Sequence, residues 1–373
     1  MNVLFVTTSY PTEDAPVAGV FVKEHALAAA EHVDVAVLHL DRSRSHRGGP
    51  RLTRVVDEAL PTWRVTYPWT PVPLSVAAHF AAAARGFWAV RRSGFVPDVV
   101  HAHFFLAGVP AVLLGRLTQT PVVVTEQWSV FLPEDPMTLT RLLRAAARFA
   151  YGRADLVLPA SDALRRGIEA EGIHTRFEVV PNVVDTTLFV PDGDARNGRL
   201  LAVGLLYEAK GYEYLLEAVA LLRREGRDIE LDIVGDGPER AACTRLADDL
   251  GLDGHVVFHG IVPKPEVARR MREASLFVLT SRYDNNPCVL IEAMASGLPA
   301  VATAVGGIPE VVDDSSGILA RPRDPRSIAD AIASALDHPG GWDRRGIAES
   351  AATRFGRAEI GRRLAEIYGR VAR

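Results

Sequence analysis

Short apolar runs alternate with segments of helical periodicity along the whole chain, and this alternation constrains the fold most strongly. The apolar runs of the first half are NVLFV, VDVAVLHL, PDVVHAH, PVVVT, ADLVLP and FEVVP, and those of the second half are RLLAVG, IELDIVG, HVVFHG, SLFVLT, PAVAT and GILA. Short apolar runs bounded by turn formers are typical of buried strands. Strands that alternate with helices favour parallel sheets joined by right-handed crossovers. We therefore predict an α/β protein with doubly wound parallel sheets.

Two series of strands in 373 residues indicate two domains. The polar, turn-rich segment 190–199 separates the series, so we predict Rossmann-like domains at 1–190 and 195–355 that face each other across a cleft. The amphipathic last helix, near 357–373, follows the final strand–helix unit, and packing back onto the first domain is one arrangement open to it. Because parallel sheets bind ligands at the carboxyl ends of their strands, we expect the site in the cleft.

The composition is that of a globular protein, with 48% hydrophobic and 24% charged residues. Its two cysteines, Cys243 and Cys288, offer neither a disulfide framework nor a zinc-binding spacing. The first residues, MNVLFVTTSYP, lack the basic start of a signal peptide, and no apolar run is long enough to span a bilayer. The expected location is the cytoplasm.

Segment 41–92 has a local charge of +6, from nine arginines against three acids. The same segment contains the aromatic residues Trp63, Trp69, Phe80, Phe87 and Trp88. One interpretation is a solvated loop followed by a partly buried helix. The other is a face that touches an anionic acceptor or the inner surface of the membrane. The basic run is local and no nucleic-acid motif accompanies it, so a nucleic-acid partner is not predicted.

A lysine stands between a strand and a helix in the second half. The strand at 200–203 ends at Gly204, and Lys210-Gly211 precede the next helical segment. Of the 42 lysines and arginines, only Lys23, Lys210 and Lys264 are lysines. An ammonium beside a helix N-terminus favours an anion, although a solvated lysine is the alternative.

Two glycine turns also follow strands. LDIVGDGPER contains Gly235 and Gly237, but Arg240 stands where a third glycine would complete the dinucleotide fingerprint. Gly306-Gly307 follow another strand. Such glycines permit close approach of the backbone to a ligand, and a purely structural turn is the other interpretation.

The segment YDNNPCVLIEAMASG contains two acids, Asp284 and Glu292, with seven residues between them. Asn286 suits a helix N-cap, Pro287 the first helical position and Gly297 the C-cap. Asp284 then lies in the loop, Glu292 lies about one and a half turns inside the helix, and the helix N-terminus lies between them. A hydroxyl-rich ligand that carries a diphosphate fits this arrangement.

These motifs resemble the donor domain of glycosyltransferase family 4, retaining enzymes with the GT-B fold. The resemblance is carried by VG…KG at 203–211, VGDGPE, the two acids ending in EAMASGLPAVAT, and GGIPEVV. It implies that Lys210 binds the donor diphosphate, that Asp284 meets the sugar hydroxyls and that Glu292 meets the ribose. The further donor contacts that we expect are Gly19, Gly204, Gly235, Gly237, Asn285, Asn286, Pro287, Cys288 and Val289. The chain departs from the family at Asp284, usually Glu, and at Leu205, often Arg.

The first half matches the family through its glycine loop at Gly19, which in the family approaches the donor phosphates. His101 and His103 alternate onto one face after a strand, but no third ligand accompanies them, and we predict no metal; a role for His103 in lining the cleft is favoured. Gln127 stands where the family often has a histidine near the reacting centre. Glutamine can hydrogen-bond a hydroxyl or phosphate but cannot serve as a general base.

The resemblance implies a bacterial, metal-independent hexosyltransferase of cell-envelope or polysaccharide biosynthesis. The donor would be a UDP- or GDP-linked sugar, the acceptor a hydroxyl of a sugar, a lipid-linked molecule or a polysaccharide precursor, and no cofactor is expected. The residues expected at the reaction are Lys210, Asp284, Gln127 and His103. A metal-dependent transferase of the other main fold would need an Asp-x-Asp after a strand, and the only such triplet, 192–194, is in the predicted linker. The alternatives are a GT-B protein that binds sugar nucleotides without transferring them, and a sugar-nucleotide epimerase or a phosphorylase of the same architecture.

Overall fold

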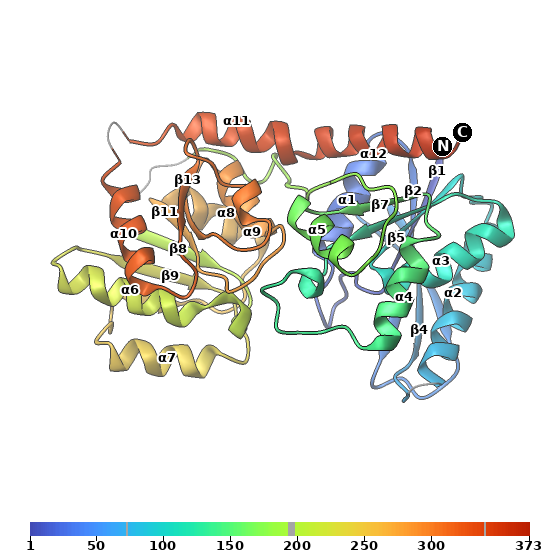
Figure 1. The fold of residues 1–373 in the computed structure, drawn as a ribbon, viewed down its shortest axis with the longest axis horizontal. Coiled ribbons are helices and arrows are strands. Elements are labelled where there is room, and N and C mark those ends of the chain that lie inside the picture. Colours follow the sequence, from blue (N-terminus) through green and yellow to red (C-terminus); the bar gives the residue numbers. More distant parts are fainter. Residues whose placement is uncertain (72–73, 193–197, 339–340) are drawn as a thin grey trace. The chain divides into compact units, whose positions relative to one another are not determined.

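The computed structural model describes residues 1–71, 74–192, 198–338 and 341–373. The chain forms two compact units, each an open sheet with helices on both faces (Figure 1). The first unit contains 1–131, 137–183 and 357–373, and the second contains 132–136 and 184–356. The second unit thus begins at Val184. Residues 193–197 of the predicted linker, which include Asp194 of the Asp-x-Asp triplet, lie outside the described residues. The predicted α/β class with two parallel sheets is confirmed.

The first sheet has the strand order β3-β4-β2-β1-β5-β6-β7. Its strands are β1 (Asn2–Thr7), β2 (Asp34–Ser43), β3 (Arg51–Asp57), β4 (Leu60–Pro68), β5 (Val99–His103), β6 (Val122–Glu126) and β7 (Leu156–Pro159). All neighbours pair in parallel except β3, which runs antiparallel to β4 at the edge. The helices are α1 (Val20–Ala30), α2 (Leu74–Arg92), α3 (Phe105–Thr118), α4 (Arg141–Tyr151), α5 (Asp162–Ala170) and α12 (Arg357–Val371), with a short 3₁₀ turn, η1 (Ser129–Phe131).

The C-terminal helix α12 belongs to the first unit, where it packs along α1. It buries Ile360, Leu364, Ile367 and Tyr368, and the Tyr368 hydroxyl hydrogen-bonds Nδ1 of His101 on β5 at 2.7 Å. At its first residue, Arg357 donates two hydrogen bonds to the buried carboxylate of Glu24 in α1. The last helix is therefore part of the core of the unit with which the chain begins.

The second sheet has six parallel strands in the order β10-β9-β8-β11-β12-β13. They are β8 (Arg199–Val203), β9 (Glu230–Val234), β10 (Val256–Phe258), β11 (Leu276–Leu279), β12 (Ala300–Thr303) and β13 (Gly317–Ala320). The helices are α6 (Tyr212–Arg224), α7 (Arg240–Asp249), α8 (Lys264–Glu273), α9 (Cys288–Ala295), α10 (Pro325–Leu336) and α11 (Arg344–Phe355), with 3₁₀ turns η2 (Glu208–Lys210) and η3 (Ile308–Glu310).

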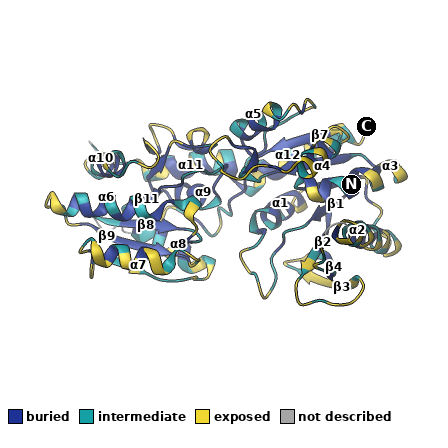
Figure 2. Ribbon diagram, turned by 60° about the horizontal axis from the view of Figure 1, so that its bottom comes forward, coloured by how far each residue is buried: buried dark blue, intermediate teal, exposed yellow. Residues whose placement is uncertain are grey.

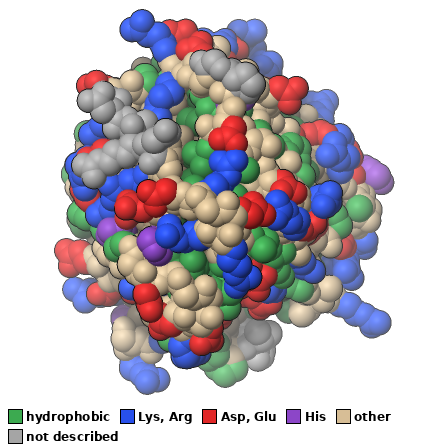
Figure 3. All heavy atoms as spheres, turned by 90° about the vertical axis from the view of Figure 1, so that its left-hand side faces the viewer, with side chains coloured by type: hydrophobic (Ala, Val, Ile, Leu, Met, Phe, Trp, Pro, Cys, Tyr) green, Lys and Arg blue, Asp and Glu red, His purple; other side chains and the backbone are tan. Residues whose placement is uncertain are grey.

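The central strands are buried on both faces, and the exposed residues lie mainly on the outer sides of the helices (Figure 2). In the second unit one apolar layer lies beneath α9 and α11, and another lies beneath α6 and α10. Strands covered on both faces read as continuous apolar runs, which is why the sequence revealed them. Figure 3 shows that cationic and anionic side chains are interspersed over the side of the second unit where α6, α7 and α10 lie.

The segment 41–92 departs from the solvated loop that one interpretation expected. Strand β2 continues to Ser43, and β3 and β4 form an antiparallel hairpin. The hairpin turn is made by Glu58 and Ala59, both with positive φ and neither of them glycine or asparagine, so the usual turn signal is missing. β3 lies at the edge with most of its residues exposed, so it lacks a continuous apolar run.

The run FEVVP was predicted to be a strand and is not one. It forms an isolated bridge to β7 between Val157 and Phe177, and Glu178 N and Val180 N donate to the carbonyls of Val157 and Pro159. Pro159 has no N–H, so it cannot donate the bond that would continue the ladder.

Candidate functional site

The loops that follow β8 and β11, which are neighbours in the second sheet, bring two predicted site residues into contact. Lys210 lies in η2, and its Nζ is 2.5 Å from Oδ2 of Asp284, in the loop after β11. Both side chains remain partly accessible, at 24% and 16% exposure. The Ser281 hydroxyl donates to the same carboxylate oxygen at 3.2 Å. A cation and an anion are thus fixed together at the carboxyl edge of the sheet, where α/β proteins bind ligands.

Backbone contacts hold these two loops against each other. The Thr280 hydroxyl donates to the carbonyl of Gly211 at 3.0 Å, and the amide of Arg282 donates to the carbonyl of Ala209 at 2.7 Å. Gly211 has φ 61° and is the N-cap of α6. An ammonium group therefore stands next to a helix N-terminus, as the sequence predicted.

The glycine pair after β12 supports Asp284 from the other side. Gly306 has φ 51°, and a Cβ there would lie 1.9 Å from the carbonyl oxygen of Asp284. The amide of Gly307 donates to that oxygen at 3.2 Å, and the Thr303 hydroxyl donates to the carbonyl of Ser281 at 2.6 Å. The paired glycines therefore place the acid-bearing loop, which explains them without a ligand.

Helix α9 begins one residue later than the sequence predicted. Its first residue is Cys288 and its N-cap is Pro287, not Asn286, because Pro287 has an extended ψ of 115°. Glu292 is the fifth residue of α9 and is nearly buried, with its Oε1 3.6 Å from Nζ of Lys264 at the start of α8. The helix N-terminus lies between Asp284 and Glu292 in the chain, as expected.

The remaining glycines predicted to contact a donor pack two loops together. A Cβ on Gly235, after β9, would lie 1.9 Å from the carbonyl oxygen of Gly204, after β8. A Cβ on Gly237 would lie 2.5 Å from the carbonyl oxygen of Leu206. These contacts account for the glycines structurally, which was one of the two interpretations. Asn285 is buried, whereas Cys288 and Val289 are half-buried in the first turn of α9.

The first unit collects three histidines behind the carboxyl end of its sheet. The ring centroids of His101 and His103 are 4.6 Å apart, and those of His25 and His103 are 5.6 Å apart. His103 is fully buried and stacks on Phe5. Neither of its ring nitrogens has a hydrogen-bond partner among the described residues. Burial lowers the pKa of all three imidazoles, and the neighbouring imidazoles lower that of His103 further, against a smaller opposing effect of Gln127. Burial therefore disfavours a positive charge on all three rings.

Gln127 follows β6 and is half-buried. Its Nε2 donates to Oδ1 of Asn182 at 2.6 Å and lies 3.4 Å from Nδ1 of His25. The N-cap of α1 is Gly19, where φ is 64° and a Cβ would lie 2.3 Å from the carbonyl oxygen of Ser9. The first unit thus contains Gly19, His103 and Gln127, whereas Lys210, Asp284 and Glu292 are in the second.

Two buried polar residues of the first unit, His25 and Glu126, were not among the predicted site residues. His25 occupies the buried face of α1 along with Val22 and Ala26, and a polar residue at such a position is the signal that could have found it. Glu126 ends β6, is fully buried, and accepts hydrogen bonds from the amides of Gln127 and Trp128. Burial raises the pKa of Glu126, and these bonds act in the opposite direction. Its carboxylate therefore fixes the backbone that carries Gln127.

Among the residues that the structure describes, no group of three or more His, Cys, Asp or Glu side chains is arranged to hold a metal ion. Within the same residues, no helix combines the length and apolar character that crossing a bilayer requires.

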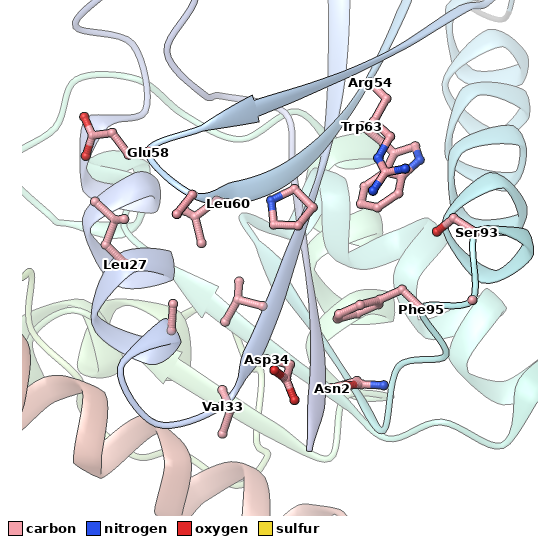
Figure 4. Close-up of a pocket in the computed structure, with 15 residues that line it drawn as sticks. Asn2, Leu27, Val33, Asp34, Arg54, Glu58, Leu60, Trp63, Ser93 and Phe95 are labelled. Atoms are coloured by element: carbon pink, nitrogen blue, oxygen red, sulfur yellow. The ribbon is translucent and has the colours of Figure 1, made fainter.

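A cavity of about 650 Å³ lies at the amino ends of the strands of the first sheet (Figure 4). Asn2 and Asp34, the first residues of β1 and β2, line it together with Arg54 and Trp63 of the hairpin. The guanidinium of Arg54 lies over the Trp63 ring, 4.7 Å from its centroid. None of the predicted site residues lines this cavity, which is at the amino ends of the strands.

Comparison with known proteins identifies the family. Residues 197–338 match a model described as glycosyl transferases group 1, and residues 23–183 match a glycosyl transferase 4-like domain. The chain is 30% identical over 341 residues to an alpha-D-kanosaminyltransferase of Streptomyces kanamyceticus, and the match covers 81% of this chain and 87% of the relative. The chain is a group 1 glycosyltransferase.

This glycosyltransferase is also similar to other known proteins. It is 32% identical to a GDP-mannose-dependent phosphatidylinositol monomannoside mannosyltransferase of Mycolicibacterium smegmatis, over 63% of this chain and 67% of the relative. Among solved structures, sucrose-phosphate synthase of Thermosynechococcus elongatus aligns with TM-score 0.80, 20% identity and coverage of 99% of this chain and 98% of that chain. HepE of Anabaena in complex with UDP-glucose aligns with TM-score 0.76, 20% identity and coverage of 99% and 100%. The predicted GT-B fold is confirmed.

Proposed function

We propose that this glycosyltransferase moves a hexosyl group from a nucleoside-diphospho-sugar to a hydroxyl acceptor, with retention at the anomeric carbon and without a divalent metal. The observation that carries the proposal is the contact between Lys210 and Asp284 beside the N-terminus of α9. The cation, the helix end and the two acids fit the phosphates, the sugar and the ribose of such a donor.

The two charges of the Lys210–Asp284 pair bind different parts of the donor. An ammonium has three N–H donors, of which one faces Asp284, so two remain for phosphate oxygens. The Asp284 carboxylate does not bind a phosphate, because like charges at close range repel. It accepts hydrogen bonds from sugar hydroxyls instead. Glu292, which lies within 3.6 Å of Lys264, is the matching acceptor for ribose hydroxyls.

The same groups stabilise the charge that develops during transfer. When the bond between the anomeric carbon and the diphosphate oxygen breaks, negative charge grows on the leaving diphosphate. In this proposal the Lys210 ammonium and the amides at the starts of α6 and α9 donate hydrogen bonds to that charge. No separate nucleophile is proposed: the acceptor oxygen attacks from the face that the leaving group vacates, and the leaving phosphate takes the proton of the acceptor hydroxyl.

The proposed donor is UDP- or GDP-linked, and the proposed acceptor is a hydroxyl of a lipid-linked or polysaccharide precursor. HepE binds UDP-glucose, and the Mycolicibacterium relative uses GDP-mannose, which supports both nucleotides. Relatives described as putative glycosyltransferases of teichuronic and colanic acid biosynthesis support the acceptor class.

Turnover of a panel of UDP- and GDP-sugars tests the proposal. We expect the purified chain to hydrolyse or transfer at least one donor, with undiminished rate in excess chelator. Asp284→Asn keeps the side-chain shape and removes the charge, so kcat/KM should fall about 10- to 100-fold, the effect of one lost charged hydrogen bond. The matched control is Asp314→Asn, at an exposed aspartate of the same unit. Full activity in Asp284→Asn contradicts the role of this acid, and loss of activity in chelator contradicts metal independence.

A further inference from the structure

Three helices on one face of the first sheet carry no acidic residue at all. α2 packs against α3, and α3 packs against α4, so the three helices form a continuous layer. They contain no Asp or Glu, and their arginines are Arg85, Arg91, Arg92, Arg116, Arg141, Arg144 and Arg148. We call this layer the α2–α3–α4 face.

Each helix of the face exposes at least one large apolar side chain. On α2, Leu74 is 66% exposed and Trp88 is 36% exposed. On α3, Leu117 is 71% exposed, and on α4, Leu142 is 60% exposed. Large apolar side chains that are exposed singly need no explanation, but several of them on three helices that pack side by side indicate an interaction surface.

The arginines of these helices are largely free of carboxylates. Within the described residues, no carboxylate lies within ion-pair distance of Arg85, Arg92, Arg116 or Arg141. Arg144 is the exception, because it pairs with Glu171. Arg91 lies over the Trp88 ring, 5.7 Å from its centroid.

The start of α2 extends the face toward Trp69, just after β4. Trp69 is exposed, and the guanidinium carbons of Arg42 and Arg44 each lie 5.7 Å from its ring centroid. Arg42 also donates to the Ser75 hydroxyl in the first turn of α2 at 3.3 Å. An aromatic ring between two cations therefore borders the aliphatic surface.

The helices of the second unit show what an ordinary solvated surface looks like in this chain. On α8, Arg269 pairs with Glu266 and Glu273, and on α10, Arg326 pairs with Asp330. Such pairing leaves little net field. On the α2–α3–α4 face only Arg144 has a carboxylate partner among the described residues, so most of the positive field remains, which favours a polyanionic partner. The exposed leucines favour a partner with an apolar interior.

We propose that the α2–α3–α4 face binds the surface of a bilayer that contains anionic phospholipids. The arginines meet lipid phosphates, while Leu74, Leu117 and Leu142 enter the boundary between head groups and acyl chains and Trp88 lies at the head-group level. The proposal extends the contact expected of segment 41–92, because α2 lies within that segment whereas α3 and α4 lie outside it. None of Lys210, Asp284 or Glu292 takes part, so the membrane proposal does not depend on the proposed donor site.

Vesicle flotation tests the proposal with the full chain. We expect binding to phosphatidylcholine–phosphatidylglycerol vesicles at low salt, loss of binding at high salt, and no binding to phosphatidylcholine alone. In the variant Arg85→Gln/Arg92→Gln/Arg116→Gln, affinity should fall on the order of a hundredfold, because each arginine near an anionic surface contributes about fivefold. Leu117→Ser/Leu142→Ser should weaken binding while the dependence on salt remains.

A matched variant separates this face from net charge. Arg224→Gln/Arg245→Gln/Arg345→Gln removes the same charge from exposed positions on α6, α7 and α11 and should bind vesicles like the wild type. Circular dichroism and donor turnover confirm that each variant is folded. The proposal is overturned if the wild type does not bind anionic vesicles at low salt, or if both arginine variants lose binding equally. It is also overturned if gel filtration shows that this face joins two copies of the chain and no vesicle binding occurs.

Discussion

At the scale of single residues, the geometry assigns different tasks to charges that look alike in the sequence. Lys210 and Lys264 each contact one of the two acids of the second unit, whereas Lys23 contacts Asp57 and Glu58 in the first. Of the other two lysines, only Lys23 lies away from the proposed donor site, so Lys23 is the control for removing Lys210.

The buried histidines make the first unit sensitive to acid. His39 in β2 is almost fully buried, accepts a hydrogen bond from Arg64 at 3.2 Å, and has its pKa lowered to about 3, first by burial and then by Arg64. Because this pKa lies below the value of about 6.5 in the unfolded chain, His39 contributes no instability above pH 6.5. Below pH 6.5 the unfolded state takes up the proton first, and stability falls by about 1.4 kcal/mol per pH unit for this histidine.

We therefore predict that lowering the pH from about 7 to about 5 costs about 2 kcal/mol through His39 alone. Urea unfolding of the wild type and of His39→Gln at both pH values measures this, because glutamine keeps an acceptor for Arg64 but does not titrate. The wild type should lose more stability than the variant. Equal losses would show that His39 does not remain neutral in the folded protein.

At the scale of elements, strands buried on both faces could be predicted from the sequence, and the edge of the first sheet could not. β1 and β11 are continuous apolar runs, but β3 is largely exposed and its turn at Glu58 and Ala59 has no glycine or asparagine. FEVVP looked like a strand because the run is largely apolar, while Pro159 of its neighbour prevents a ladder. Periodicity reports burial, and it does not report which backbone groups are able to pair.

In the candidate site, too, local features could be predicted from the sequence and contacts between loops could not. The sequence predicted that Asp284 lies before α9 and Glu292 inside it, because acids after a strand and turn formers before a helix are local signals. It did not predict that Lys210 contacts Asp284, because that contact depends on β8 and β11 being neighbours in the sheet. Contacts between loops depend on strand order, which no local pattern encodes.

The loop that carries Asp284 depends on Gly306, and we predict that Gly306→Ala damages both stability and donor turnover. The added Cβ would lie 1.9 Å from a backbone oxygen, so the loop must move, at a cost of about 1–3 kcal/mol beyond that of the left-handed φ. Gly254→Ala is the matched control, because it has φ 75° and nothing within 4 Å. Thermal unfolding and kcat/KM should separate the two variants. If Gly306→Ala behaves like Gly254→Ala, Gly306 does not position Asp284.

At the scale of the whole molecule, the C-terminal helix completes the unit in which the chain begins. The sequence showed that the last helix is amphipathic, but an apolar stripe does not identify its partner, so its packing on α1 was left open. Leu364 of this helix is fully buried in the core of the first unit.

We predict that Leu364→Ala destabilises the first unit by about 2–5 kcal/mol, the usual cost of removing a buried leucine side chain. Hydrogen exchange should show faster opening of β1 and β5, while the strands β8 and β11 of the second unit keep their protection. An exposed substitution on the same helix, Arg362→Ala, should leave both unchanged within about 0.5 kcal/mol. Equal loss of protection in the two units would mean that they open together.

The central claim is that the second unit binds a nucleoside-diphospho-sugar with Lys210 on its phosphates. Calorimetric titration of UDP, GDP and their sugar conjugates into the wild type, Lys210→Ala and Lys23→Ala tests it most directly. We predict that the wild type binds one nucleotide series, that Lys23→Ala binds equally well, and that Lys210→Ala binds about 10- to 100-fold more weakly, the effect of a lost charged contact. Wild-type affinity in Lys210→Ala, or no binding of either series to the wild type, would contradict the account.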